Sequence, residues 1–323
     1  GGDLVGFGGV VALANGNYVV SSPYWSPDTL NNVTQVGAVT WGDGLIGSLG
    51  EVVPANSLVG SSSYDNVGLG ATNLLTGVTS GGVVALPAGN YGVVSPNWSD
   101  APGLVLAAGA VTWRDGLAAS GGVAVGADNS LIGSKAQDRV GNGGVVSLDL
   151  GRYVVVSHQW SLDPDALTSA PAVAEVGAVT FVDPALPARG AGVVSAANSL
   201  VGSSEFDHVG FGSNGVDGVV ALKLGDQASG NYVVVSPDWQ QPAAGLVPAA
   251  LVGAVTWGSG DGSSVGAVNA GNSLVGSTTG DRIGSGGVVA LTNGNYVVAS
   301  PQWSNADPLA DGTPNLVANV GAV

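Results

Sequence analysis

A nine-residue segment recurs five times along the chain, and this internal repeat constrains the fold more than any other feature. The first copy reads Asn17-Tyr18-Val19-Val20-Ser21-Ser22-Pro23-Tyr24-Trp25, and the others lie at 90–98, 152–160, 231–239 and 295–303. Successive repeat tyrosines are 73, 62, 79 and 64 residues apart, and we predict that they occupy equivalent positions and are at least half buried. Such a period is typical of a chain that stacks copies of one supersecondary unit. The sequence therefore predicts one repeat domain over 1–323, with units near 1–64, 65–137, 138–206, 207–280 and 281–323, the last incomplete.

Each unit contains four short apolar runs with the features of β-strands. In the first unit they are Gly9–Leu13, the Tyr-Val-Val run, Gly37–Trp41 and Asn56–Ser61. The runs are rich in Val, Tyr, Thr and Trp and are bounded by Gly, Asn, Ser, Pro and Asp, as strands usually are. Asn15-Gly16 between the first two runs predicts a type I′ hairpin turn and antiparallel neighbours. No stretch has a sustained helical period, so we expect almost no helix.

Four antiparallel strands per unit favour an all-β fold, a β-propeller of about five four-stranded blades. Val-Val doublets place apolar side chains on both faces of a strand, which suits blades packed on both sides. The alternative is a β-solenoid or another all-β repeat array, in which each unit would comprise several coils and which the Gly and Asn content also fits.

The composition excludes several classes of function. Only 9% of the residues are charged, against about 25% in typical proteins, and the net charge is −16. Nucleic acid and anionic membrane surfaces repel such a chain, so we expect neither as a partner. No apolar run is long enough to span a bilayer as a helix, so we expect no membrane insertion. The chain has no cysteine, which rules out disulfides and thiolate metal sites.

The order of motifs resembles the FG-GAP repeat of integrin α-subunit propellers. Asp65-Asn66-Val67-Gly68-Leu69-Gly70 precedes a Gly-Val-Val-Ala-Leu strand, and Phe7-Gly8 and Phe211-Gly212 echo the Phe-Gly element. Ser22-Pro23 and its counterparts echo the end of the second strand. FG-GAP blades often carry an Asp-x-Asp-x-Asp-Gly calcium loop, whereas the corresponding turns here are poor in acids. The resemblance therefore implies a propeller without implying calcium.

The Asn-Tyr-Val-Val-x-Ser-Pro-x-Trp segments also resemble repeats of very large secreted bacterial adhesin-like proteins. That resemblance implies a non-enzymatic structural or adhesive module at the cell surface or outside the cell, with self-association, other surface proteins or glycans as partners. The alternative function is a carbohydrate-binding propeller lectin. We expect no cofactor.

One aspartate recurs before Val-Gly or Ile-Gly in every unit, and it is the first candidate for chemistry. A repeated metal ligand is one interpretation, but a single carboxylate per loop is too few for a cation that takes six or more oxygens. We therefore predict that these aspartates cap a turn between units. They are Asp3, Asp65, Asp138, Asp207 and Asp281.

A tryptophan follows the second run in every unit and is the second candidate. These rings could stack on sugars if the protein is a lectin, but packing between units is the favoured role. They are Trp25, Trp98, Trp160, Trp239 and Trp303. A second aromatic set ends the third run and is also predicted to pack. It comprises Trp41, Trp113, Phe181 and Trp257.

No group of residues has the spacing of a catalytic site. His158 replaces the proline of the Ser-Pro element and His208 lies in an Asp-x-Val-Gly loop, but neither recurs. No serine lies in a Gly-x-Ser-x-Gly elbow, and the glycine-rich stretches lack a phosphate-binding lysine. We therefore predict that the chain is not an enzyme and has no catalytic or metal residues.

The ends of the sequence suggest a portion of a longer polypeptide. Residue 1 is Gly, and the last unit stops at Gly321-Ala322-Val323, before its fourth run. An incomplete unit would leave an unpaired strand edge, which can recruit strands from other chains. Assembly into a longer array or filament and a plain monomer are both open at this point.

Overall fold

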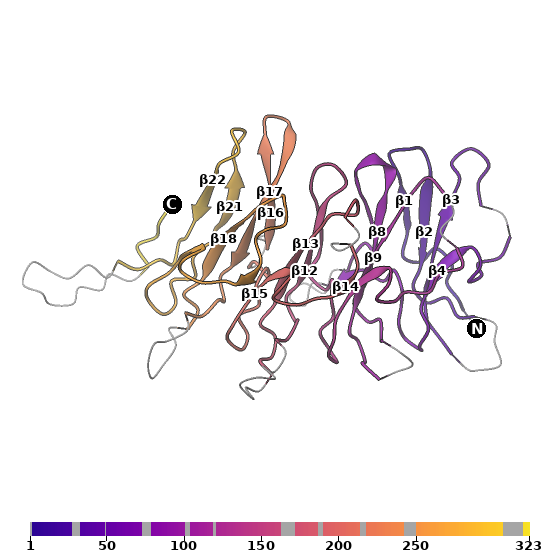
Figure 1. Ribbon diagram of the computed structural model, residues 1–323, viewed down its shortest axis with the longest axis horizontal. Coiled ribbons are helices and arrows are strands. Elements are labelled where there is room, and N and C mark those ends of the chain that lie inside the picture. Colours follow the sequence, from indigo (N-terminus) through magenta and orange to yellow (C-terminus); the bar gives the residue numbers. More distant parts are fainter. Residues whose placement is uncertain are drawn as a thin grey trace, which may run out of the picture. The chain divides into compact units, whose positions relative to one another are not determined.

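The computed structural model describes most of the chain, and its backbone is almost entirely strand and turn (Figure 1). The described residues are 2–27, 33–48, 50–72, 79–100, 104–118, 121–162, 172–186, 190–213, 218–241, 250–305 and 319–323. Parts of the long insertions predicted between the second and third runs, at 28–32 and 163–171, lie outside them. Two compact units can be distinguished, one of residues 1–157 and 181–194, the other of 158–180 and 195–323. We describe each unit by itself.

The four predicted runs are strands in each of the first four repeats, and in the fifth repeat the first two runs are strands. The first strands are β1 (Val10–Ala12), β7 (Val83–Ala85), β11 (Gly144–Ser147), β16 (Val219–Leu224) and β21 (Gly287–Ala290). The second strands are β2 (Tyr18–Ser22), β8 (Tyr91–Ser95), β12 (Tyr153–Ser157), β17 (Gln227–Ser236) and β22 (Tyr296–Ala299). The third strands are β3 (Ala38–Gly42), β9 (Ala110–Arg114), β13 (Ala178–Val182) and β18 (Ala254–Gly258). The fourth strands are β4 (Ser57–Val59), β10 (Ser130–Ile132), β15 (Ser199–Val201) and β20 (Ser273–Val275).

Within a repeat the strands form an antiparallel meander. The first repeat has the order β1-β2-β3-β4, and the fourth has β16-β17-β18-β20. In the first, Val11 pairs with Val19, Val19 with Trp41 and Val39 with Leu58. Thr40 pairs with Ser57, and their buried hydroxyl groups share a 2.7 Å hydrogen bond. The same Thr–Ser hydrogen bond recurs in the next three repeats. The antiparallel pairing of the first two runs is confirmed in all five repeats.

The hairpin turn between the first two strands is not the type I′ turn that Asn-Gly predicted. In the described turn of the first repeat, Gly16 has a φ of +89° but Asn15 does not have a positive φ. The Gly16 N–H donates to the Leu13 carbonyl and the Leu13 N–H donates to the Asn17 carbonyl. This is the three-residue hairpin, a type I turn followed by a left-handed glycine, and it needs positive φ at one residue only.

Sheet hydrogen bonds continue from one repeat into the next. The fourth strand β10 pairs in parallel with β14 (Gly192–Val193), which lies in the following repeat and in the same unit. In the other unit β15 pairs in parallel with β19 (Gly266–Ala267). Val59 and Ala124 form the equivalent bridge between the first two repeats. The last described strands, β21 and β22, form a two-stranded sheet, with Ser300 bridged to Ala322.

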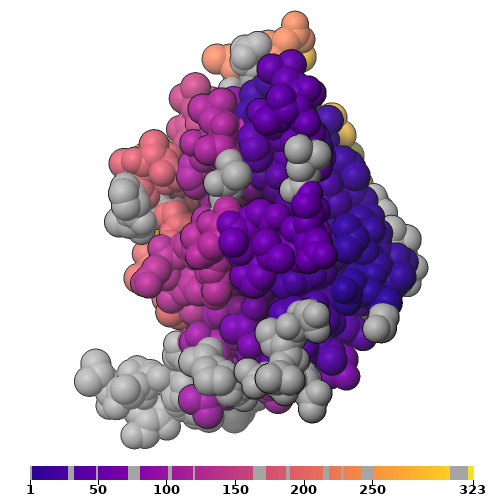
Figure 2. All heavy atoms as spheres, turned by 90° about the vertical axis from the view of Figure 1, so that its right-hand side faces the viewer, coloured from indigo at the N-terminus to yellow at the C-terminus, as the bar shows by residue number. Residues whose placement is uncertain are grey.

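The core also runs from repeat to repeat within a unit. In the first unit one buried cluster joins side chains of the first two repeats, such as Val19 and Leu58 with Val93 and Trp98. In Figure 2 these repeats, coloured indigo and purple, form one closely packed surface. In the second unit Val233 and Ile283 belong to a cluster that continues into the fifth repeat.

The prediction of an all-β repeat fold with almost no helix is therefore confirmed. The one short helical turn described, η1 (Pro87–Gly89), lies in a hairpin. A five-bladed ring is not confirmed. No helix in the described part of the chain is long and apolar enough to cross a membrane.

Candidate functional site

The recurring aspartates form the joints between successive repeats. One oxygen of the Asp65 carboxylate accepts hydrogen bonds from the N–H groups of Ser61 and Ser62, both at 2.8 Å, at the end of the first repeat. Its other oxygen accepts from the Ser99 N–H at 3.0 Å, just after Trp98 of the second repeat. The carboxylate thus connects the end of one repeat with the core tryptophan of the next.

The same joint recurs at Asp207 and Asp281 in the second unit. Asp207 accepts from the N–H groups of Ser203, Ser204 and Gln240, at 2.8, 2.8 and 2.9 Å. Asp281 accepts from those of Ser277, Thr278 and Ser304, at 2.9, 2.9 and 3.0 Å. In the first unit Asp138 accepts from the N–H groups of Ser134 and Lys135. Asp3 is exposed and stands apart from this set.

A close backbone approach accompanies each joint. At Gly37, whose φ is +77°, a Cβ atom would lie only 2.2 Å from the Val67 nitrogen. The Val67 N–H donates to the Val36 carbonyl at 3.0 Å. Any side chain at Gly37 would push the two repeats apart, so this glycine is required by packing as well as by conformation.

The electrostatics of the joints are those of a buried, hydrogen-bonded carboxylate. Asp65, Asp138, Asp207 and Asp281 all have side chains shielded from solvent. Burial raises the pKa of Asp65, although the N–H groups that it accepts from act in the opposite direction. Burial also raises the pKa of Asp207 to about 6. Among the described residues no group of three or more His, Asp or Glu side chains could hold a metal. The turn-capping prediction is therefore sharpened: Asp65, Asp207 and Asp281 each cap a turn and also tie it to the next repeat.

The tryptophans after the second strand lie in the core. Trp25, Trp98, Trp160 and Trp239 are at most 5% exposed, and Trp303 is partly buried. Stacking on a sugar needs an exposed ring face, so these exposures favour the packing role. The repeat tyrosines are also more than half buried, as the repeat pattern predicts: Tyr91, Tyr153 and Tyr232 are at most 1% exposed, and Tyr18 and Tyr296 are intermediate.

A family model described as "Repeat of unknown function (DUF5650)" matches the chain five times. The matched residues are 12–69, 85–142, 147–211, 227–285 and 290–323. The chain belongs to this repeat family. The match supports the five repeats and shows no FG-GAP repeat. No curated protein matches the chain.

The DUF5650 repeats differ from one another at the loop that follows the third strand. We call the contact of this loop with the preceding repeat a seam. In the first seam the Gly116 carbonyl of the second repeat accepts hydrogen bonds from Asn15 Nδ2, Asn17 Nδ2 and Trp41 Nε1, at 2.8, 2.9 and 2.9 Å. A Cβ at Gly116 would lie 1.8 Å from the Gly89 carbonyl oxygen. Glycine at this position therefore lets the loop approach the hairpins closely.

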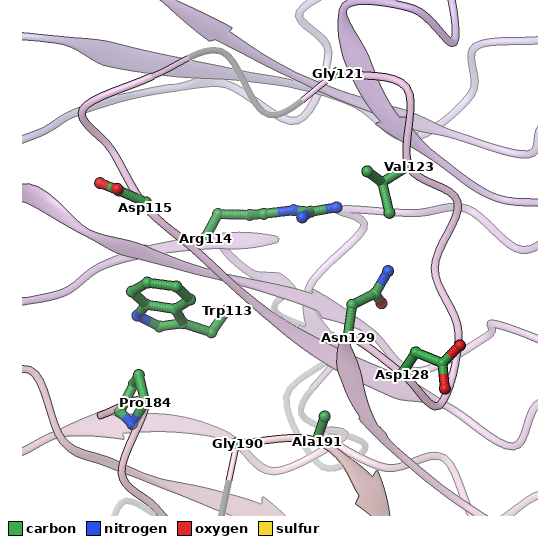
Figure 3. A pocket seen from close by; sticks show the side chains of 10 residues that line it. All are labelled: Trp113, Arg114, Asp115, Gly121, Val123, Asp128, Asn129, Pro184, Gly190 and Ala191. Atoms are coloured by element: carbon green, nitrogen blue, oxygen red, sulfur yellow. The ribbon is translucent and has the colours of Figure 1, made fainter. Parts of the chain in front are cut away.

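The second seam lies between the second and third repeats, within the first unit, and it is open. Pro184 occupies the position of Gly116, and Ala88 that of Asn15. Trp113, the counterpart of Trp41, has a buried indole N–H with no acceptor among the described residues. A cavity of about 560 Å³ lies here. Figure 3 shows Trp113 beside Pro184 and the Arg114 side chain extending across the cavity toward Val123 and Asn129.

Arg114 is the unusual side chain of this cavity. Its Nε and Nη2 atoms are buried and have no hydrogen-bond partner in the described part of the chain. Burial lowers the pKa of the Arg114 guanidinium, and the neighbouring Tyr91 opposes that effect. The equivalent residues of the other repeats are Gly42, Val182 and Gly258. The sequence analysis missed this site, although two departures from the repeat, Arg114 and Pro184, were visible signals.

The two histidines come together in the second unit. The ring centroids of His158 and Phe211 are 4.8 Å apart, and those of His208 and Phe211 are 5.8 Å apart. His208 Nε2 lies 3.0 Å from Glu175 Oε2, and Asp238 pairs with Arg282 on the other side. Burial, followed by the charge of His208, lowers the pKa of His158 to about 4. His158 is thus a neutral core residue at pH 7.

Proposed function

We propose that the chain is a non-enzymatic structural or adhesive repeat module of a large secreted or cell-surface bacterial protein. The observation that carries the proposal is the joint built on the recurring aspartate. Three backbone donors from two repeats meet one buried carboxylate, and the same geometry recurs along the chain. Repetition of one satisfied joint supports a chain that extends by adding units, which is how repeat proteins are built.

For the architecture, we favour a β-solenoid-like or other all-β repeat array over a five-bladed propeller. Propeller blades are separate sheets that pack face to face. Here the fourth strand of a repeat hydrogen-bonds in parallel with the next repeat, at β10–β14 and at β15–β19. A step of this kind does not depend on a fixed number of repeats, whereas a ring does.

Deleting one whole repeat tests this preference. Removal of residues 65–137 joins Tyr64 to Asp138, so that Asp138 can take the place of Asp65 at the joint. We expect the shortened chain to melt cooperatively, within a few degrees of the parent. A deletion of residues 101–137, which removes β9 and β10 and leaves half a repeat, is the control and should not fold. Loss of folding in both chains would favour the closed ring.

Surface labelling of intact cells tests the location and the role. An antibody against this chain should label the producing bacterium without permeabilisation, and cells that lack the gene should attach less firmly to surfaces or to one another. Labelling that requires lysis would contradict the proposal, as would turnover of a substrate by the purified chain.

Carbohydrate binding is the second candidate function. The cavity at the second seam supports it, because Trp113 offers a partly exposed ring next to polar side chains. A glycan array probed with the chain tests this candidate. Binding that depends on Trp113 would support it.

A further inference from the structure

The cavity at the second seam contains a cation, the Arg114 guanidinium, two of whose nitrogens have no acceptor in the described part of the chain. Nε and Nη2 lie on one edge of the Arg114 guanidinium, the edge that a carboxylate binds with two parallel hydrogen bonds. Both atoms are shielded from water and have no acceptor among the residues that the structure describes. No described carboxylate forms an ion pair with Arg114, although Asp115 and Asp128 line the same cavity. Leaving such donors unpaired is unfavourable, so an oxyanion that entered the cavity and met this edge, once the side chain had turned it toward the cavity, would bind with a gain in free energy.

The surroundings of Arg114 restrict the kind of oxyanion. Trp113 lines the cavity with a ring, and rings of this kind bind the C–H faces of sugars. Asp115 uses one oxygen to accept from the Leu117 N–H at 2.9 Å, so its other oxygen can accept a hydroxyl group. Asp115 and Asp128 would repel a second negative charge. The ligand that fits carries one carboxylate and several hydroxyl groups on a ring.

The cavity exists because of the residues that are special to this seam. In the first seam the loop at Gly116 lies against the hairpins and its carbonyl uses the Trp41 N–H. Proline at 184 cannot approach as closely as glycine, and it lacks the N–H that Gly116 donates to Asn90 at 3.5 Å. The Arg114 side chain lies in the space that remains. Among the first four repeats, only the second has arginine directly after the aromatic residue of the third strand.

We infer that the cavity at Trp113, Arg114 and Pro184 binds an acidic sugar of the uronic-acid class. The Arg114 side chain turns its Nε/Nη2 edge to the carboxylate, the ring of the sugar lies on Trp113, and Asp115 accepts a hydroxyl group. This inference deepens the second candidate function and is independent of the structural role of the repeats.

Titration of the 323-residue chain with three probes tests the inference. Glucuronate has the carboxylate and the ring, glucose has the ring alone, and acetate has the carboxylate alone. Isothermal titration at low salt should show saturable binding of glucuronate, with glucose and acetate each at least ten-fold weaker. Equal affinity for glucose and glucuronate would overturn the inference, as would the absence of saturable glucuronate binding. Acetate as tight as glucuronate would mean a simple anion site and would overturn it as well.

Two variants and a control locate the binding. Arg114→Gly introduces the residue of the first and fourth repeats and should weaken glucuronate binding at least ten-fold without changing glucose binding. Trp113→Ala should weaken glucuronate and glucose together. Lys223→Gln removes the same charge at an exposed strand position in the other unit and should leave affinity within two-fold. If Trp113→Ala does not fold, Arg114→Gly decides alone. If the chain binds glucose and Arg114→Gly leaves the affinity for glucuronate unchanged, this inference is refuted. The lectin candidate would survive that result.

Discussion

The first and second seams are built from equivalent positions of the same repeat, yet one is closed and the other holds a cavity. In the first, the Gly116 carbonyl accepts three side-chain donors from the preceding repeat. In the second, the glycine is Pro184, one of the asparagines is Ala88, and the Trp113 N–H has no acceptor among the described residues. The contrast teaches that a repeat can keep its joints and core while a few loop residues convert a packed contact into a candidate binding site.

The joints themselves do not differ in this way. Asp65 and its counterparts keep the same donors from repeat to repeat, because a buried carboxylate that loses an N–H partner is costly. Asn15 of the first seam is exposed, so water can replace a hydrogen bond that it loses. Variation is therefore tolerated at the seams and not at the joints.

The largest expected effect comes from giving the first seam the proline of the second. Gly116→Pro puts side-chain atoms where a Cβ would already be 1.8 Å from the Gly89 carbonyl oxygen. It also removes the N–H that donates to Asn90. Overpacking and the lost hydrogen bond together should lower the free energy of unfolding by about 3–4 kcal/mol, measured by chemical denaturation.

The matched control is the reverse change in the second seam. Pro184→Gly should cost no more than about 1 kcal/mol, because it mainly increases the freedom of the unfolded chain. Equal losses in the two variants would mean that the seams do not differ in packing.

The next largest effect concerns His158, where the third repeat also departs from the repeat pattern. His158 stands where most repeats have proline, and its pKa is lowered to about 4. A lowered pKa in the folded state gives stability above the unfolded pKa of about 6.5, and that stability is lost as the pH falls toward 4. Relative to His158→Pro, the parent should lose up to about 3 kcal/mol between pH 7 and pH 4.

The measurement must be this difference and not the raw pH profile of the parent. The raised pKa of Asp207 acts in the opposite direction, because its contribution is fully present below about pH 4 and is lost as the pH rises through about 6. Asp207 is present in both chains, so its effect largely cancels. A pH-independent difference between the chains would show that His158 is not neutral in the core.

A smaller difference in stability is expected between variants that remove the indole N–H group of each seam. Trp41→Phe removes a hydrogen bond to the Gly116 carbonyl, whereas Trp113→Phe removes an N–H that has no acceptor among the described residues. Both variants lose similar ring area from partly buried positions. Trp41→Phe should therefore be less stable than Trp113→Phe by about 1–1.5 kcal/mol in thermal melts. The opposite order would place the stronger contact in the second seam.

The smallest effect concerns the exposed asparagine of the first seam. Asn15→Ala loses the 2.8 Å hydrogen bond to the Gly116 carbonyl and should cost about 0.5–1 kcal/mol, because water replaces part of it. Ala88→Asn adds the same side chain to the second seam, at a residue whose φ of +64° suits asparagine, and should change stability by less than about 0.5 kcal/mol. A larger stabilisation by Ala88→Asn would show that the second seam can close.

The repeat itself allowed much of the fold to be predicted. The Tyr-Val-Val and Gly-Ala-Val-Thr-Trp runs are strands because they are short, β-branched and bounded by turn residues. The aspartate before Val-Gly was correctly expected to cap a turn. The turn type at Asn15-Gly16 was predicted wrongly, since Asn-Gly suits both a two-residue loop and a three-residue loop with glycine last.

What the sequence by itself determined is the local and periodic part of this protein: the all-β class, the five repeats, the strands of these repeats and the burial of their tyrosines. Only the tertiary structure decided how one repeat meets the next. The second oxygen of Asp65 binds the Ser99 N–H, 34 residues away, and Trp41 binds the Gly116 carbonyl, 75 residues away. Strand formation depends on neighbours along the chain, so a short sequence pattern is enough to predict a strand. A joint, a seam or a cavity depends on two segments brought together by folding, and neither segment alone carries that information.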